Sequence, residues 1–160
     1  MKKTAIALAS ALLLLTACDS SSTDGSGAGG MGAGAAGTGM GVLGQTADGS
    51  DVGDRVFFAL DSSVIDSEGQ GTLARQAEWL KSNSSTNITV EGHADERGTR
   101  EYNIALGERR ATAAKNYLVG QGVPAGRIST ISYGKERPAV TGNDEGAWAQ
   151  NRRAVTVVAN

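Results

Sequence analysis

The sequence predicts an α/β fold (α+β), a two-layer sandwich in which two main helices pack on a mixed four-stranded sheet. Three observations support it. Two segments carry apolar side chains at helical spacing, four short segments are rich in Val, Ile or Phe, and polar or Gly-containing turns separate them. Helices interleaved with strands over about 110 residues are typical of a single two-layer domain with one modest core.

The four expected strands are short and end in turn residues. The first is a buried run that stops at the turn cluster Asp61-Ser-Ser, and the second places Ile88 and Val90 on one face before it ends at His93. The third alternates until Gly134 ends it, and the last is rich in Val. Their ranges are residues 55–60, 88–93, 128–133 and 153–158.

The first main helix is expected over residues 67–82. Asp66 or Ser67 is suited to cap its N-terminus, and Leu73, Ala77 and Leu80 recur on one face, with Trp79 beside them. That face is therefore predicted to belong to the core. A short helix is also expected at 144–150.

The second main helix, expected over residues 101–119, combines a core stripe with a polar edge. At about 100° per residue, Asn103, Leu106 and Arg110 lie along the flank of the stripe. From this flanking position we expect Arg110 to be replaceable without unfolding the domain. The stripe itself consists of Ile104, Ala111, Ala114 and Leu118.

A charged loop bracketed by Gly92 and Gly98 joins the second strand to this helix. It follows a strand's C-terminal end, where open α/β sheets tend to place ligands. If the loop folds back over the helix, Asp95 and Arg110 present a carboxylate and a five-donor guanidinium to one small space. Such a pair suits a zwitterionic ligand.

These motifs resemble the OmpA-like peptidoglycan-binding domain family, and more specifically the peptidoglycan-associated lipoproteins (Pal). The resemblance covers roughly residues 55 to 158. Ala59-Leu60 departs from the Asp-Phe expected in Pal-type relatives. The matching residues are Glu91-Gly-His-Ala-Asp-Glu-Arg-Gly98, Asn103-x-x-Leu106-Gly-Glu-Arg-Arg110-Ala111, Ser132-Tyr-Gly-Lys-Glu136 and Asn151-Arg-Arg153.

The resemblance implies a non-catalytic module that binds the diaminopimelate stem peptide of peptidoglycan. It implies ligand contacts from Asp95 and Arg110, aligned with Asn103, Leu106 and Asp61, and no cofactor. It also implies a link between outer membrane and cell wall, with Tol-system periplasmic proteins as partners, in envelope integrity and cell division. Arg109, Arg152 and Arg153 match further family positions, where structural pairing is an alternative.

The N-terminus is expected to be a lipoprotein signal peptide, residues 1–17. Lys2 and Lys3 precede an apolar run of about 11 residues, too short for a membrane-spanning helix, and Leu-Thr-Ala leads to Cys18, the only cysteine. The spacing resembles a lipobox, which makes Cys18 the lipid attachment site at the periplasmic face of the outer membrane. Asp19 resembles an inner-membrane retention signal of enteric bacteria, so sorting between the two membranes stays open.

Residues 18–50 are expected to be the lipidated cysteine and a disordered tether, followed by a folded domain at 51–160. The segment is dominated by Gly, Ala, Ser and Thr and has no apolar periodicity. As a Gly-rich coil it would span about 30 Å, and about 110 Å when fully extended.

A second function class is a periplasmic cell-wall hydrolase that uses His93 and Asp95. A metal site is not expected, because His93 is the only histidine and Cys18 the only cysteine. The imidazole is instead expected to hydrogen-bond to backbone. A net charge of −2 gives no support for nucleic-acid binding. A solvated charged surface is expected from Glu96, Arg97, Arg100 and Glu101.

Overall fold

A computed structural model describes residues 42–159 of the chain. The predicted signal peptide, Cys18 and most of the predicted tether lie outside this range. Within residues 42–159, no helix combines the length and the hydrophobicity needed to cross a membrane.

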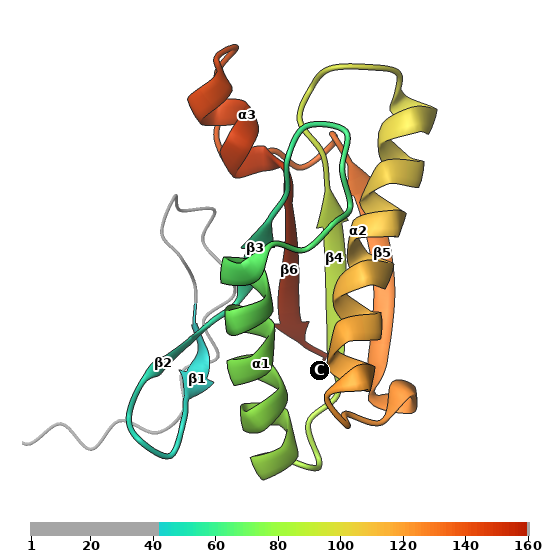
Figure 1. Ribbon diagram of the computed structural model, residues 1–160. Helices are drawn as coiled ribbons and strands as arrows, with labels where there is room; N and C mark the ends of the chain where they lie inside the picture. Colours follow the sequence, from blue (N-terminus) through green and yellow to red (C-terminus); the bar gives the residue numbers. More distant parts are fainter. Residues whose placement is uncertain (1–41, 160) are drawn as a thin grey trace, which may run out of the picture. The chain divides into compact units, whose positions relative to one another are not determined.

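The predicted mixed four-stranded sheet is confirmed (Figure 1), with the strand order β3-β6-β4-β5. The central strand β6 pairs antiparallel with β3 and β4, whereas β4 pairs parallel with β5. The parallel pair requires a crossover, which α2 provides between β4 and β5. The strands are β3 (Arg55–Phe57), β4 (Ile88–His93), β5 (Ile128–Gly134) and β6 (Arg153–Val158).

Both main helices, α1 (Ser67–Ser82) and α2 (Arg100–Gly120), cover the same face of this sheet (Figure 1). Asp66 caps α1 by accepting from the Gly69 amide at 2.8 Å, and Thr99 caps α2 by accepting from Tyr102 at 3.2 Å. The core between the layers contains the predicted apolar residues of α1 and all of the α2 stripe except Ile104, which is half-buried. A short helix, α3 (Glu145–Asn151), precedes β6.

A hairpin of β1 (Val42–Gln45) and β2 (Asp51–Gly53) precedes the main sheet and was not predicted. It begins inside the segment expected to be tether, so regular structure starts before residue 51. Gly44 makes the close packing possible, because a Cβ there would lie 2.4 Å from the Trp79 indole nitrogen. β3 ends at Phe57 rather than residue 60, and a 3-10 turn, η1 (Ala125–Arg127), precedes β5.

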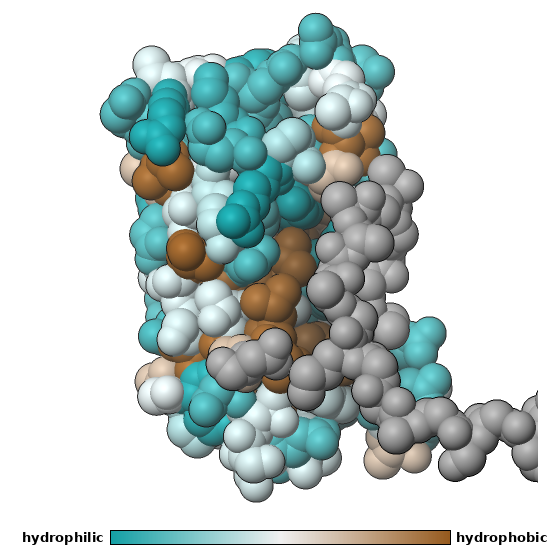
Figure 2. Space-filling model, turned by 180° about the vertical axis from the view of Figure 1, so that it is seen from behind, coloured by the Kyte–Doolittle hydropathy of each residue, from teal (hydrophilic) through white to brown (hydrophobic). Residues whose placement is uncertain are grey.

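The sheet face turned away from the helices carries both apolar and charged side chains (Figure 2). In register, Ile131 neighbours Glu91 and Glu91 neighbours Val155 on this face, since the adjacent Val90 points into the core. Ile131 is 40% exposed.

Two glycines bring α2 unusually close to the end of β4. A Cβ built on Gly92 would lie 1.9 Å from the carbonyl oxygen of Gly107, and one on Gly107 would lie 2.3 Å from the Ser132 hydroxyl. The helix therefore contacts the sheet through backbone at this point. This contact fixes the first turns of α2 beside the loop that leaves β4.

Candidate ligand-binding site

A pocket of about 300 Å³ lies where the loop after β4, the first turns of α2 and the loop between β3 and α1 meet. All five residues predicted for the ligand site line it, so the structure brings them together. They are Asp61, Asp95, Asn103, Leu106 and Arg110, and the remaining lining residues are Leu60, Arg97, Gly98 and Tyr102.

The loop after β4 is held in place by side chains from two other segments. The Asn103 amide donates to the Arg97 carbonyl at 2.8 Å, and Lys135 donates to the Glu96 and Gly98 carbonyls at 3.1 and 2.7 Å. Gly98 has a φ of 90°, a conformation that glycine adopts without strain. The loop is therefore a fixed wall of the pocket.

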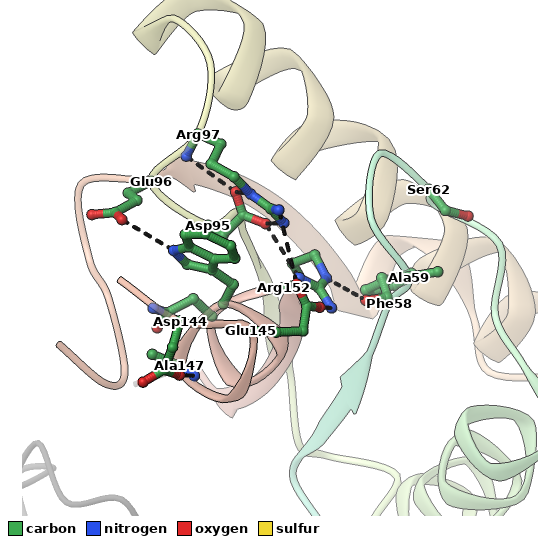
Figure 3. A network of polar contacts seen from close by, with 12 residues as sticks. Phe58, Ala59, Ser62, Asp95, Glu96, Arg97, Asp144, Glu145, Ala147 and Arg152 are labelled. Carbon is green, nitrogen blue, oxygen red and sulfur yellow. Dashed lines mark hydrogen bonds and ion pairs between the residues drawn. The ribbon is translucent and has the colours of Figure 1, made fainter. Parts of the chain in front are cut away.

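Asp95 is almost fully buried, and two arginines reach its carboxylate (Figure 3). Arg97 donates to it through Nη2 at 2.7 Å and Nε at 3.2 Å, and Arg152 donates through Nη1 at 3.4 Å. Burial alone would raise the pKa of Asp95, but the hydrogen bonds from Arg97 and Arg152 hold it below its ordinary value. Asp95 is therefore a carboxylate at neutral pH.

Arg110 lines the pocket from below and is fully buried in the empty site. Its guanidinium donates to three carbonyls, those of Ser62 at 2.8 Å, His93 at 2.8 Å and Ala59 at 3.1 Å. Burial lowers its pKa to about 10, so it stays charged at neutral pH. Arg110 is therefore more than an edge of the core stripe, because its side chain joins the β3–α1 loop to the end of β4.

Asp61 lies at the mouth of the pocket in a left-handed conformation, with a φ of 53°. Aspartate tolerates this region better than most residues. The Tyr102 hydroxyl, from the first turn of α2, donates to its carboxylate. Asp61 is exposed, so this second carboxylate faces solvent.

α3 brings residues to the site that the sequence did not indicate. The Arg97 guanidinium stacks on the Trp148 ring, 4.0 Å from its centre, and the Trp148 indole donates to Glu96 at 3.0 Å. Arg97 is thus paired and stacked, and the expectation that it is merely solvated is wrong. Arg152 is buried and also donates to the Phe58 carbonyl at 2.9 Å and to Glu145 at 2.6 Å.

His93 faces a different environment from the pocket. Its ring lies 5.6 Å from that of Tyr133, and Nε2 lies 3.6 Å from a Glu91 oxygen, slightly too far for a hydrogen bond. Within residues 42–159 neither ring nitrogen has a hydrogen-bond partner, so the expected bond from imidazole to backbone is not formed. The hydrolase alternative requires the imidazole of His93 to reach Asp95. In the structure the Asp95 carboxylate is paired with Arg97 and Arg152 instead.

Comparisons with known proteins assign the family. Residues 57–152 match the model of the OmpA family. The chain belongs to the OmpA family, which is not a family of enzymes. The expected family and the expected non-catalytic class are therefore confirmed.

Within that family, the chain is similar to proteins named peptidoglycan-associated lipoprotein. The protein of that name from Rhizobium meliloti (strain 1021) is 60% identical over 107 residues, which cover 67% of this chain and 61% of the relative. The one from Haemophilus influenzae is 52% identical over 100 residues, covering 62% and 65%. The chain thus spans less than two thirds of the length of these relatives.

Solved structures confirm the fold. The peptidoglycan-associated lipoprotein from Burkholderia pseudomallei aligns with a TM-score of 0.65 at 42% identity, over 66% of this chain and 90% of that one. The C-terminal domain of Helicobacter pylori MotB aligns with a TM-score of 0.62 at 21% identity, over 67% and 84%. At 21% identity, the similarity to MotB is evidence for the fold alone.

Proposed function

We propose that this domain binds peptidoglycan non-covalently, by holding the end of a diaminopimelate side chain in the pocket beside Asp95. The observation that carries the proposal is the composition of that pocket. Two carboxylates and two guanidinium groups line one space of about 300 Å³: Asp61, Asp95, Arg97 and Arg110. Balanced charges of both signs suit a ligand that carries an ammonium and a carboxylate on one carbon.

Asp95 and Arg110 each recognise one charged group of the ligand. Asp95 accepts from the ligand's ammonium. A guanidinium has five N–H donors and Arg110 uses three on carbonyls, so one N–H on each terminal nitrogen is left for the ligand's carboxylate. A Lys-type stem peptide lacks this carboxylate, which leaves buried donors unpaired at a cost of about 1 to 3 kcal/mol. It is expected to bind roughly ten- to a hundredfold more weakly.

The rest of the chain supplies a second attachment. A lipid on Cys18 would hold the protein at the periplasmic face of the outer membrane, and the Gly-rich segment would give the domain a reach of about 30 Å on average. Attachment at both ends benefits from a high effective concentration. In this role the protein links outer membrane and cell wall, as a partner of Tol-system proteins in envelope integrity and cell division.

The decisive measurement is calorimetric titration of the full-length protein with diaminopimelate-type and Lys-type stem peptides. Asp95→Asn keeps the shape of the side chain but removes its charge, and we expect it to lose binding at least tenfold. Glu78→Gln removes a charge from an exposed position of α1 away from the pocket, and it should bind like the wild type.

Two results would contradict the proposal. One is equal affinity for the two peptides, which would remove the role of the second carboxylate. The other is release of soluble fragments from purified sacculi by the protein, which would instead support a hydrolase.

A further inference from the structure

The carboxylate of Asp95 has no free capacity for a ligand in this structure. An ionised carboxylate offers about four lone-pair positions. The Arg97 amide donates to it at 3.1 Å, in addition to the Arg97 side-chain bonds at 3.2 and 2.7 Å and the Arg152 bond at 3.4 Å. Four donors therefore fill the four positions. An ammonium ligand reaches Asp95 only by displacing one of them.

The side chain of Arg97 is the donor that is free to leave. The Arg152 side chain is 7% exposed and is also held by Phe58 and Glu145, and the backbone amide moves only with its loop. The Arg97 side chain is 33% exposed and lines the pocket. Its bonds to Asp95 are thus the ones that an incoming cation can replace.

α3 offers Arg97 a second set of contacts. The guanidinium already stacks at 4.0 Å on Trp148, and its Nη1 lies 3.8 Å from a Glu145 oxygen. An arginine that releases Asp95 keeps its cation–π contact and has a carboxylate close by. Figure 3 shows Arg97 beside the carboxylate of Asp95 and Glu145 beside Arg152.

We propose that Arg97 is an intramolecular competitor, which occupies Asp95 in the empty site and moves toward Glu145 when a ligand ammonium takes its place. This inference rests on the proposed function, and it assigns to Arg97 the selectivity of the pocket for the ligand's amine. A ligand displaces Arg97 only with a cation of its own, so a free amine is selected over an acylated one. The competition also weakens binding of the correct ligand, since the Asp95–Arg97 pair is broken first.

The test compares Arg97→Ala and Arg97→Gln with the wild type, by calorimetric titration of the full-length proteins with a diaminopimelate stem peptide. Removing the competitor should tighten binding about two- to fivefold, the range expected for a partly exposed ion pair. For the same peptide with its side-chain amine acetylated, the Arg97 variants should show no gain in affinity over wild type. Arg100→Ala is the matched control, since Arg100 is a neighbouring exposed arginine that pairs with Glu136 and not with Asp95.

The outcomes separate this inference from the proposed function. In one outcome, wild type binds the free-amine peptide selectively, and both Arg97 variants are folded by circular dichroism but bind that peptide no more tightly than wild type. Arg97 is then no competitor, and the proposed function stands. If the Arg97 variants also bound the acetylated peptide more tightly than wild type does, the competition for Asp95 would be refuted. Binding of the free-amine peptide by the Arg97 variants but not by wild type would support the competition for Asp95. No binding by any variant would overturn both.

Discussion

Arg110 combines a structural role with its proposed binding role. By volume it is the largest side chain that the described residues bury completely. It satisfies the carbonyls of Ala59, Ser62 and His93, which belong to two separate segments of the chain. A site built in this way gains a fixed guanidinium, because the three bonds lock its position before a ligand arrives.

Arg110→Ala is therefore expected to destabilise the domain by about 3 kcal/mol or more, because three carbonyls lose their donor. Urea unfolding measures the loss. Arg109→Ala is the matched control and should change the free energy of unfolding by less than about 0.5 kcal/mol. Arg109 is exposed, and its guanidinium lies 6.0 Å from the centre of the Tyr102 ring. Equal stability of Arg110→Ala and wild type would contradict the structural role.

His93 makes stability depend on pH near neutrality. Burial lowers its pKa, the charges of Arg153 and Arg137 lower it further, and Glu91 opposes them. The unfolded chain then binds more protons than the folded one below pH of about 6.5, so stability is complete above that pH and falls as the pH drops.

Between pH 7.5 and 5.5 we expect the free energy of unfolding to fall, by at most about 1.4 kcal/mol, the limit set by the ordinary pKa of histidine. Because His93 is the only histidine, His93→Gln should remove most of this dependence. A drop of the same size in His93→Gln would assign the effect to other groups.

At the scale of elements, the contact between β4 and α2 positions the pocket. Gly92 and Gly107 let strand and helix meet through backbone, and the loop with Asp95 leaves β4 directly after this contact. A side chain on Gly92 cannot be accommodated by a rotamer change, because the atoms it would meet are backbone atoms of Gly107.

Gly92→Ala is expected to cost about 3 kcal/mol of stability and to weaken ligand binding as α2 shifts. Gly71→Ala is the control, since Gly71 is half-buried in α1 and the nearest atom to its Cβ would be an Arg75 nitrogen at 3.8 Å. It should stabilise the protein by about 0.5 to 1 kcal/mol, because alanine favours helix. Thermal unfolding of both variants distinguishes the crowded glycine from the open one.

At the scale of the whole molecule, the chain carries a net charge of only −2, so long-range attraction contributes little to its placement. The proposed retention at the outer membrane therefore requires a specific anchor. The proposed anchor is the lipid on Cys18, at the far end of the Gly-rich segment.

Cys18→Ser should give a protein that no longer partitions with membranes but still sediments with purified sacculi, since the pocket is formed by residues 60–110. Membrane fractionation and a sacculus pull-down measure the two properties separately. Mass spectrometry that finds an unmodified Cys18 on mature wild-type protein would refute the anchor.

Local sequence signals predicted both main helices and the four strands of the main sheet, and five of the nine residues that line the pocket were expected as ligand contacts. Caps and apolar spacing are local, so Asp66 and the stripe on α1 predicted a helix whose limits agree with 67–82. The run from Asp95 to Arg110 contains four of these residues, which lie together because a loop and the helix that follows it are close in space. Asp61 was expected only from the family resemblance. Residues 42–50 escaped prediction, since β1 is stabilised by packing on Trp79 rather than by its own alternation.

The pairing of the site residues depends on contacts between distant segments of the chain. Asp95 and Arg152 are 57 positions apart, and Arg110 lies 51 positions from the carbonyl of Ala59. Periodicity fixes where a side chain points relative to its own element, but not which distant element meets it. The stacking of Arg97 on Trp148, the burial of Arg110 and the turn of the His93 ring away from the pocket all follow from such distant contacts, formed when the layers pack together.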